Sequence, residues 1–126
     1  MKLTALITSA SQEVTIPVKR QYTTIQLLQA IHYKSSNSPK LLNIKIDECD
    51  NTNYYSYGNE LFNYTFTYFQ NGASSVEYWE YTNQIASFRD ERIDKLTLTI
   101  TESDGTAPAG GDLSSTNYMI LEFDLQ

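Results

Sequence analysis

Apolar and polar side chains alternate along much of this sequence with a period of two residues. A β-strand turns successive side chains to opposite faces of its sheet, so this period predicts strands with one buried face. The clearest cases are residues 96–100, where leucine and isoleucine alternate with threonine, and residues 119–125, whose odd-numbered positions are apolar. The pattern indicates an all-β protein.

The same alternation predicts strands at five further places. Residues 41–49 and 61–69 show it strongly, and each is expected to form one continuous strand. Shorter apolar runs predict strands at residues 3–8, 14–18 and 76–82. Pro17 indicates a strand end or a sheet edge, because proline donates no ladder hydrogen bond. Residues 1–20 are therefore expected to form an edge strand or an arm.

Two segments carry helical features. Within residues 23–33, Ile25, Leu28 and Ile31 follow helical spacing. Ile25, Leu27 and Ile31 instead follow strand spacing. A strand is therefore favoured, and a helix remains the alternative. Residues 83–88 are expected to form at most a short helical connector between strands.

Turn-forming residues separate these runs and set the number of strands. Segments rich in Ser, Asn, Asp, Gly or Pro lie at residues 35–39, 50–59, 70–75 and 104–115. Seven or eight strands remain, which is the number expected of a single jelly roll or β-sandwich of antiparallel strands. The chain of 126 residues suits one domain spanning residues 1–126. The long connections at 50–60 and 102–117 are expected to cross between the two sheets.

The charge and the cysteine content of the chain limit which functions and compartments are expected. The net charge of −6 disfavours a protein that coats nucleic acid, whose affinity comes from neutralised phosphates. Residues 1–40 hold five basic groups and one acid, whereas residues 41–126 hold four basic groups and fourteen acids. This asymmetry reflects either ordinary solvation or docking of the N-terminal region onto an acidic neighbour. The lone Cys49 predicts a reducing compartment, and the sequence predicts neither a signal peptide nor a membrane span.

No catalytic, cofactor or metal site is expected. The only histidine, His32, lies in an apolar run, so no nucleophile with a base can be built around it. Glu77 and Glu80 are three residues apart on a predicted strand and should face opposite ways. The oxygen-rich segment 47–53 lacks the glycine and closing glutamate of a calcium loop. The thiol of Cys49 is expected to stay protonated beside acidic neighbours. The protein is therefore expected not to be an enzyme.

Aromatic residues are concentrated in the middle of the chain, where 12 of the 16 lie between residues 54 and 88. Tyrosine joins an apolar ring to a polar hydroxyl and suits partly wet contact surfaces. An exposed loop holding Tyr54, Tyr55 and Tyr57 is expected to contact another protein subunit, with Trp79 and Tyr81 as further interface residues. The alternatives are that these aromatics fill and shield the core, or that they stack on sugars.

Some strand-forming stretches are also recognisable by their residues. Residues 41–47 read Leu-Leu-Asn-Ile-Lys-Ile-Asp, residues 50–55 read Asp-Asn-Thr-Asn-Tyr-Tyr, and residues 62–66 read Phe-Asn-Tyr-Thr-Phe. Together they resemble the middle of small jelly-roll capsid proteins of tailless icosahedral DNA viruses. Residues 95–105 and 118–123 resemble the final hairpin of the minor capsid or penton proteins of virophages, polinton-like viruses and giant viruses. The resemblance covers about half of the chain.

The resemblance implies a single jelly roll that joins or seals larger capsid subunits, without an active site or a cofactor. It implies a minor capsid, penton or cement subunit of the virion, assembled in the host cytoplasm or nucleus, with other capsid subunits and further copies of itself as partners. The alternative is a carbohydrate-binding β-sandwich module that uses the Tyr54–Tyr57 loop and Trp79 as a stacking platform.

Overall fold

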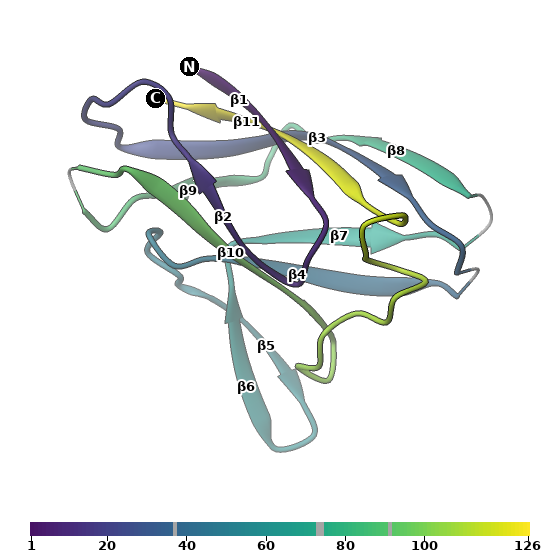
Figure 1. Ribbon diagram of the computed structural model, residues 1–126. Coiled ribbons are helices and arrows are strands. Elements are labelled where there is room, and N and C mark those ends of the chain that lie inside the picture. The colour runs from purple at the N-terminus through teal and green to yellow at the C-terminus, as the bar shows by residue number, and fades with distance from the viewer. Residues whose placement is uncertain (37, 73–74, 91) are drawn as a thin grey trace.

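Two antiparallel sheets pack face to face, and a separate hairpin stands out on one side of them (Figure 1). The structure is a computed structural model that describes residues 1–36, 38–72, 75–90 and 92–126. These residues form eleven strands and no helix. The predicted all-β sandwich or jelly roll is therefore confirmed, with more strands than the seven or eight that the sequence indicated. Within the described ranges, no helix is long and apolar enough to cross a membrane.

The strands divide into two sheets and the hairpin. Sheet A has the order β1-β11-β3-β8, and β9 pairs with the remaining part of β3. Its strands are β1 (Lys2–Ile7), β3 (Thr24–Tyr33), β8 (Val76–Glu80), β9 (Ile85–Ser87) and β11 (Met119–Leu125). Sheet B has the order β2-β10-β4-β7. Its strands are β2 (Ser11–Thr15), β4 (Lys40–Ile46), β7 (Phe66–Gln70) and β10 (Lys95–Glu102). The hairpin consists of β5 (Asn53–Tyr57) and β6 (Glu60–Tyr64).

The order of pairing defines the sandwich as a jelly roll. Strands pair from the two ends of the chain inward: β1 with β11, β2 with β10, β3 with β8, and β4 with β7. This long nested hairpin is folded over so that alternate pairs fall in opposite sheets, which additionally pairs β11 with β3 and β10 with β4. The β5–β6 hairpin is inserted between β4 and β7, at the tip of the nested arrangement.

The N-terminal segment forms one edge of each sheet. β1 lies at an edge of sheet A, and β2 lies at an edge of sheet B. β2 ends at Thr15, two residues before Pro17, which agrees with a proline at a strand end. Residues 1–15 are thus built into the sandwich by pairing with β11 and β10.

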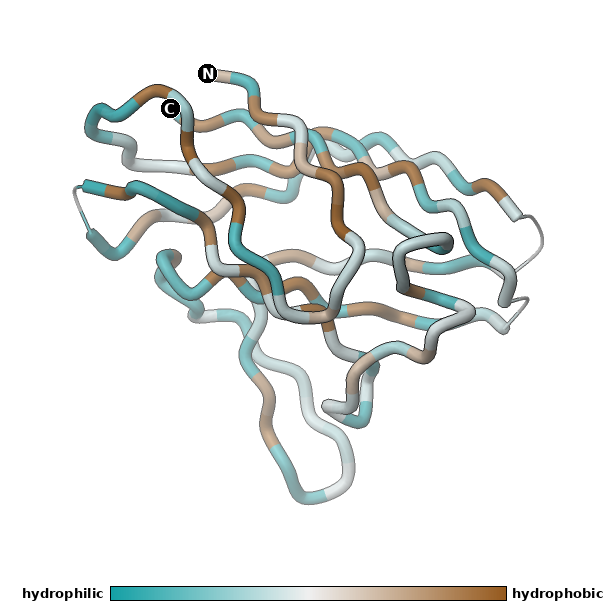
Figure 2. The backbone as a smooth tube through the Cα atoms, viewed as in Figure 1, coloured by the Kyte–Doolittle hydropathy of each residue, from teal (hydrophilic) through white to brown (hydrophobic). Residues whose placement is uncertain are grey.

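The core lies between the sheets and is made of the inward-facing residues of each strand. Hydrophobic and hydrophilic residues alternate along the strands of both sheets (Figure 2). On β10 and β11 the alternation is complete, and the inward-facing side chains are fully buried. These are Leu96, Leu98, Ile100, Met119, Leu121, Phe123 and Leu125. The odd-numbered face of β11 is therefore buried, as the sequence predicted.

The ambiguous segment at residues 23–33 is a strand, as favoured. Its mixed period has a structural cause, because the register between β3 and β11 shifts between Glu122 and Phe123. Before the shift the buried residues of β3 are Ile25 and Leu27, and after it they are Ala30 and His32. A bulge changes which positions face inward, so neither a strict period of two nor a helical period describes the whole segment.

Two local predictions are wrong. The expected single strand at residues 61–69 is broken at Thr65 into β6 and β7. Thr65 donates its backbone N–H to Ile44, and its hydroxyl oxygen accepts the N–H of Ile46, so the chain turns there to join sheet B. Residues 83–88 contain β9 and not a helical connector, because pairing with β3 satisfies their backbone groups.

The long connections also differ from expectation in one case. Residues 50–60 do not cross between sheets, since they lead into the β5–β6 hairpin and the chain returns to sheet B at β7. The connection after β10 does cross, which the sequence predicted. Because β10 and β11 lie in different sheets, residues 95–105 and 118–123 do not form the final hairpin that the resemblance implied.

Candidate functional site

The β5–β6 hairpin projects from the side of sheet B that faces away from sheet A (Figure 1). Tyr57 and Glu60 pair across its turn, which consists of Gly58 and Asn59. Gly58 has a φ of 61°, the left-handed value that the first position of a type II′ turn requires. A Cβ built on Gly58 meets no atom within 4 Å, so the tip is open to solvent.

One face of the hairpin packs against the end of sheet B. The Tyr55 ring stacks on Phe62 with centroids 5.2 Å apart, and the Tyr64 ring lies 6.1 Å from that of Tyr55. The Tyr55 hydroxyl donates a hydrogen bond of 3.1 Å to the carbonyl oxygen of Glu102, at the end of β10. Phe62 covers Gly105 so closely that a Cβ there would lie 2.5 Å from the ring. These contacts fix the orientation of the hairpin.

The opposite face and the tip carry large exposed side chains. Tyr54 and Leu61 lie on the face turned away from Tyr55, and they are 61% and 72% exposed. Tyr57 lies on the same face as Tyr55 but nearer the tip, at the end of β5, and it is 54% exposed. Large apolar and aromatic side chains that are more than half exposed on a projecting hairpin are typical of a surface that contacts another molecule. We call Tyr54, Tyr57 and Leu61 the hairpin surface.

The structure changes the sequence-based description of this region in three ways. The expected loop with Tyr54, Tyr55 and Tyr57 is a paired strand and not a loop. Tyr55 is half-buried, because it pairs with Phe62 and its ring packs on Phe62 and Tyr64. Tyr57 lies on the same face but nearer the tip, where it stays exposed. Leu61 is the most exposed large apolar residue of the described chain, and the sequence did not single it out.

Trp79 and Tyr81 do not join the hairpin surface. Trp79 lies on β8 in sheet A, which is far from β5 and β6 across the sandwich (Figure 1). Both side chains are half-buried and pack against the core, and the Trp79 ring meets Phe69 edge-on at 6.4 Å. The five predicted interface residues therefore separate into two groups, and Trp79 forms no common platform with the tyrosines.

A second exposed apolar surface lies on the outer face of sheet A. The strand registers align Leu6, Ile120, Ile31 and Tyr78 in one row across all four strands of the sheet order. Leu6 and Tyr78 are each 53% exposed. We call this row the sheet A patch. The sequence indicates it only through consecutive apolar residues, such as those at 5–7 and 119–121, that place apolar groups on both faces of a strand.

A buried ion pair links Lys34, the residue after β3, to Glu77 on β8. The ammonium group of Lys34 lies 3.3 Å from the carboxylate of Glu77, and both side chains are buried. The carboxylate also accepts hydrogen bonds from the Tyr68 hydroxyl at 2.7 Å and from the backbone N–H groups of Asn71 and Gly72. Burial alone would raise the pKa of Glu77, but these hydrogen bonds and Lys34 outweigh it and hold the pKa below its ordinary value.

His32 is buried beside this ion pair. Its Nε2 makes a close contact with the carbonyl oxygen of Asp112, and its Nδ1 has no hydrogen-bond partner among the described residues. The Asp112 carboxylate accepts hydrogen bonds from Lys40 at 2.7 Å and from Gln70 at 2.8 Å. Burial, the largest influence, lowers the pKa of His32 below 6.5, against opposing effects of Asp112 and Glu77. The imidazole is therefore neutral at pH 7.

Acidification is expected to destabilise the protein as the pH falls below about 6.5, the ordinary pKa of histidine. In this range His32 of the unfolded chain binds a proton, whereas His32 of the folded protein stays neutral until the pH reaches its own, lower pKa. Glu77 and Asp112 stay ionised there, because the pKa values of both carboxyls are held below their ordinary range. Urea midpoints measured at successive pH values should fall in the wild type and fall much less in His32→Gln. Equal slopes in the two proteins would contradict this assignment.

The carboxylate pair, the cysteine and the oxygen-rich segment considered in the sequence analysis all have structural surroundings that do not bring them together as a reactive or metal-binding site in the described residues. Glu77 is buried and Glu80 is exposed, so the pair does face opposite ways. Burial, with a smaller contribution from Glu48, raises the pKa of the Cys49 thiol to about 12. In the 47–53 segment, Glu48 accepts hydrogen bonds from Thr97, and the Asn51 amide donates to the backbone of Ile46 and Cys49. The described residues contain no group of three or more metal-ligating side chains.

The sequence matches no protein-family model, and no curated protein shows a significant match to it.

Proposed function

We propose that this protein is a non-enzymatic structural subunit of a virion, a minor capsid, penton or cement protein that assembles with copies of itself and with other capsid subunits. The observation that carries the proposal is the hairpin surface, which exposes Tyr54 and Leu61 on one face and Tyr57 near the tip of a projecting hairpin that is held in place by Tyr55. Aromatic residues at such a position contribute strongly to protein–protein contacts.

Two further observations support the proposal. The strand order is that of a jelly roll, the fold that the resemblance to viral capsid proteins implies. The hairpin surface and the sheet A patch lie on opposite sides of the sandwich, so one subunit has an apolar surface for each of two neighbours (Figure 1). A subunit within a shell needs contacts on more than one side.

Removing the hairpin surface is expected to weaken assembly while leaving the fold intact. Tyr54→Ser combined with Tyr57→Ser removes two exposed rings that make no core contact, and each interface tyrosine can contribute about 2 kcal/mol to binding. The assembly constant should be measured by sedimentation or native mass spectrometry, with melting temperature as the test of folding.

Tyr55→Ser is the informative comparison. It breaks the ring stack on Phe62 and the hydrogen bond to Glu102, so it should loosen the hairpin and lower stability. Normal assembly of the Tyr54→Ser/Tyr57→Ser variant would place the interface elsewhere and remove the main support for the proposal.

The second candidate function is carbohydrate binding. Tyr57 lies beside a cleft of about 330 Å³ that is also lined by Leu41, Glu102 and Asp104. An aromatic ring next to carboxylates is a suitable surface for stacking a sugar and bonding its hydroxyls. Retention of a monomeric protein on polysaccharide resin, lost in Tyr57→Ala, would favour this function over the structural one.

A further inference from the structure

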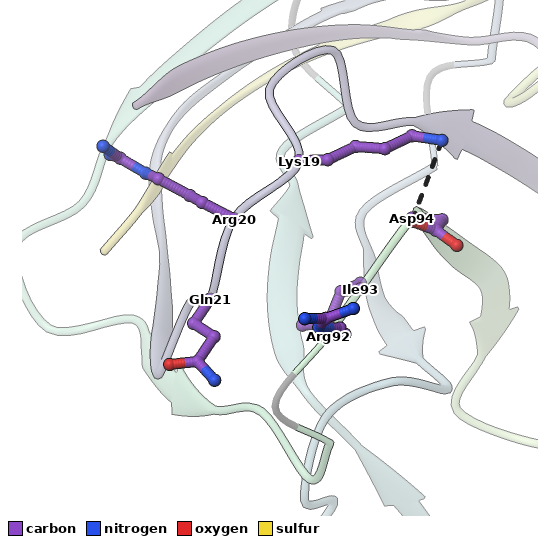
Figure 3. A pocket seen from close by; sticks show the side chains of 6 residues that line it. All are labelled: Lys19, Arg20, Gln21, Arg92, Ile93 and Asp94. Atoms are coloured by element: carbon purple, nitrogen blue, oxygen red, sulfur yellow. Dashed lines mark ion pairs between the residues drawn. The ribbon is translucent and has the colours of Figure 1, made fainter.

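A cleft lies at one end of the sandwich between two segments that are distant in sequence (Figure 3). Its volume is about 370 Å³, and its described lining is Lys19, Arg20, Gln21, Arg92, Ile93 and Asp94. One water occupies roughly 30 Å³ in the liquid, so the cleft is sized for a few side chains and not for a single small ion.

The walls of the cleft are held by the core. Next to Gln21, Tyr22 is buried, and its hydroxyl donates a hydrogen bond of 2.7 Å to the carbonyl oxygen of Val18. On the other wall Ile93 is buried, and a backbone bridge joins Gln21 to Arg92. A cleft whose walls are already fixed loses little conformational entropy when a partner binds.

The described lining of the cleft carries a net positive charge, whereas the protein is acidic as a whole. Three cations, Lys19, Arg20 and Arg92, line it against one carboxylate, Asp94. The ammonium group of Lys19 lies 4.0 Å from the carboxylate of Asp94, and both side chains are exposed. Arg20 extends in another direction (Figure 3), with its guanidinium over the Tyr22 ring. The three cations therefore point in different directions and present a positive lining without converging on one point, which suits an inserted segment better than a single small anion (Figure 3).

The hairpin of the same protein has the complementary chemistry. Its turn is open to solvent, Glu60 is the only charged residue of its two strands, and Tyr57 and Leu61 flank this acid in β5 and β6. Arginine pairs well with both carboxylates and tyrosine rings, through charge-assisted hydrogen bonds and cation–π contacts. Val18, which precedes Lys19 in the chain, is an exposed apolar side chain that could contact Leu61 of a second copy.

We propose that the hairpin tip of one copy inserts into the cleft of a second copy, with Glu60 facing its positively charged lining. This inference rests on the proposed function and names the surface that receives the hairpin. Because hairpin and cleft are different parts of the molecule, the contact is heterologous and propagates from copy to copy. It closes into a ring if the rotation between neighbours permits and otherwise continues as an open chain.

Charge reversal tests the pairing in the full-length protein. Glu60→Lys alone, and Arg20→Glu with Arg92→Glu, should each weaken self-assembly roughly ten- to hundredfold, because like charges then meet in the contact. Combining all three substitutions in one chain restores opposite charges and should return the assembly constant to within about tenfold of the wild type. Lys2→Glu is a matched reversal at an exposed position that does not line the cleft and should have little effect on assembly.

Crosslinking provides a test that does not depend on charge reversal. Asn59→Cys places a thiol at the hairpin tip, and Lys19→Cys places one at the cleft. Oxidation of a mixture of the two variants should give a disulfide-linked dimer that neither variant forms alone. Cys49 does not interfere, because it is buried and the pKa of its thiol is about 12.

The outcomes separate this inference from the proposed function. If Tyr54→Ser/Tyr57→Ser disrupts assembly while the cleft variants assemble normally, the hairpin binds elsewhere and the inference is wrong. Failure of the triple reversal to restore assembly, or crosslinking of each variant with itself, also overturns it. A wild-type protein that stays monomeric at all concentrations overturns both the self-assembly part of the proposed function and this inference.

Discussion

Leu121→Ala and Leu98→Ala are each expected to lower the free energy of unfolding by roughly 2–5 kcal/mol. Both leucines are fully buried, and they enter the core from opposite sheets, Leu121 from β11 and Leu98 from β10. Truncation removes buried methyl groups and leaves a cavity that surrounding strands fill only in part, since each strand is fixed by hydrogen bonds on both sides.

The measurement is the urea midpoint and slope for each variant. Thr99→Ala and Glu122→Gln change residues next to these leucines that face outward, and both should stay within about 0.5 kcal/mol of the wild type. Midpoints that do not move in either leucine variant would show that the inward faces of β10 and β11 are assigned incorrectly. The doubly substituted protein should be close to unfolded, because a domain of this kind has only about 5–15 kcal/mol of stability.

Glu77→Ala is expected to cost about 3–5 kcal/mol, the second large effect. The substitution leaves the buried ammonium group of Lys34 without its carboxylate and removes the acceptor for the Tyr68 hydroxyl and for two backbone N–H groups. Lys34 still donates a hydrogen bond to the carbonyl oxygen of Ser36, but breaking a buried ion pair leaves the desolvation of the remaining charge without the compensation that the carboxylate supplied.

Glu80→Ala is the matched control, since Glu80 lies on the same strand and faces solvent. Its loss should stay below about 1 kcal/mol. Lys34→Met combined with Glu77→Gln should cost less than the sum of the two single changes, because the pair is removed together. Additive costs, or a loss below about 1 kcal/mol in Glu77→Ala, would refute a coupled buried pair.

Much of the candidate site could not have been predicted from sequence. Tyr54 and Tyr57 were predicted from sequence to be exposed because turn-forming residues surround them, and both are exposed. The burial of Tyr55 depends on its pairing and ring stacking with Phe62, which is a property of the folded hairpin. Likewise, Leu61 and the cleft at Arg20 and Arg92 become visible only when strands and distant segments are placed side by side.

The sequence by itself determined the all-β class and the inward face of strands such as β10 and β11. A period of two residues is a local property, because successive side chains of any β-strand point to opposite faces of its sheet. It also indicated that Pro17 follows a strand end. Tertiary structure decided the remaining features. The break at Thr65 depends on its bonds to β4, the bulge in β3 on its pairing with β11, and β9 on the free part of β3. Each depends on hydrogen bonds between segments far apart in the chain, and local side-chain patterns do not encode which segments meet.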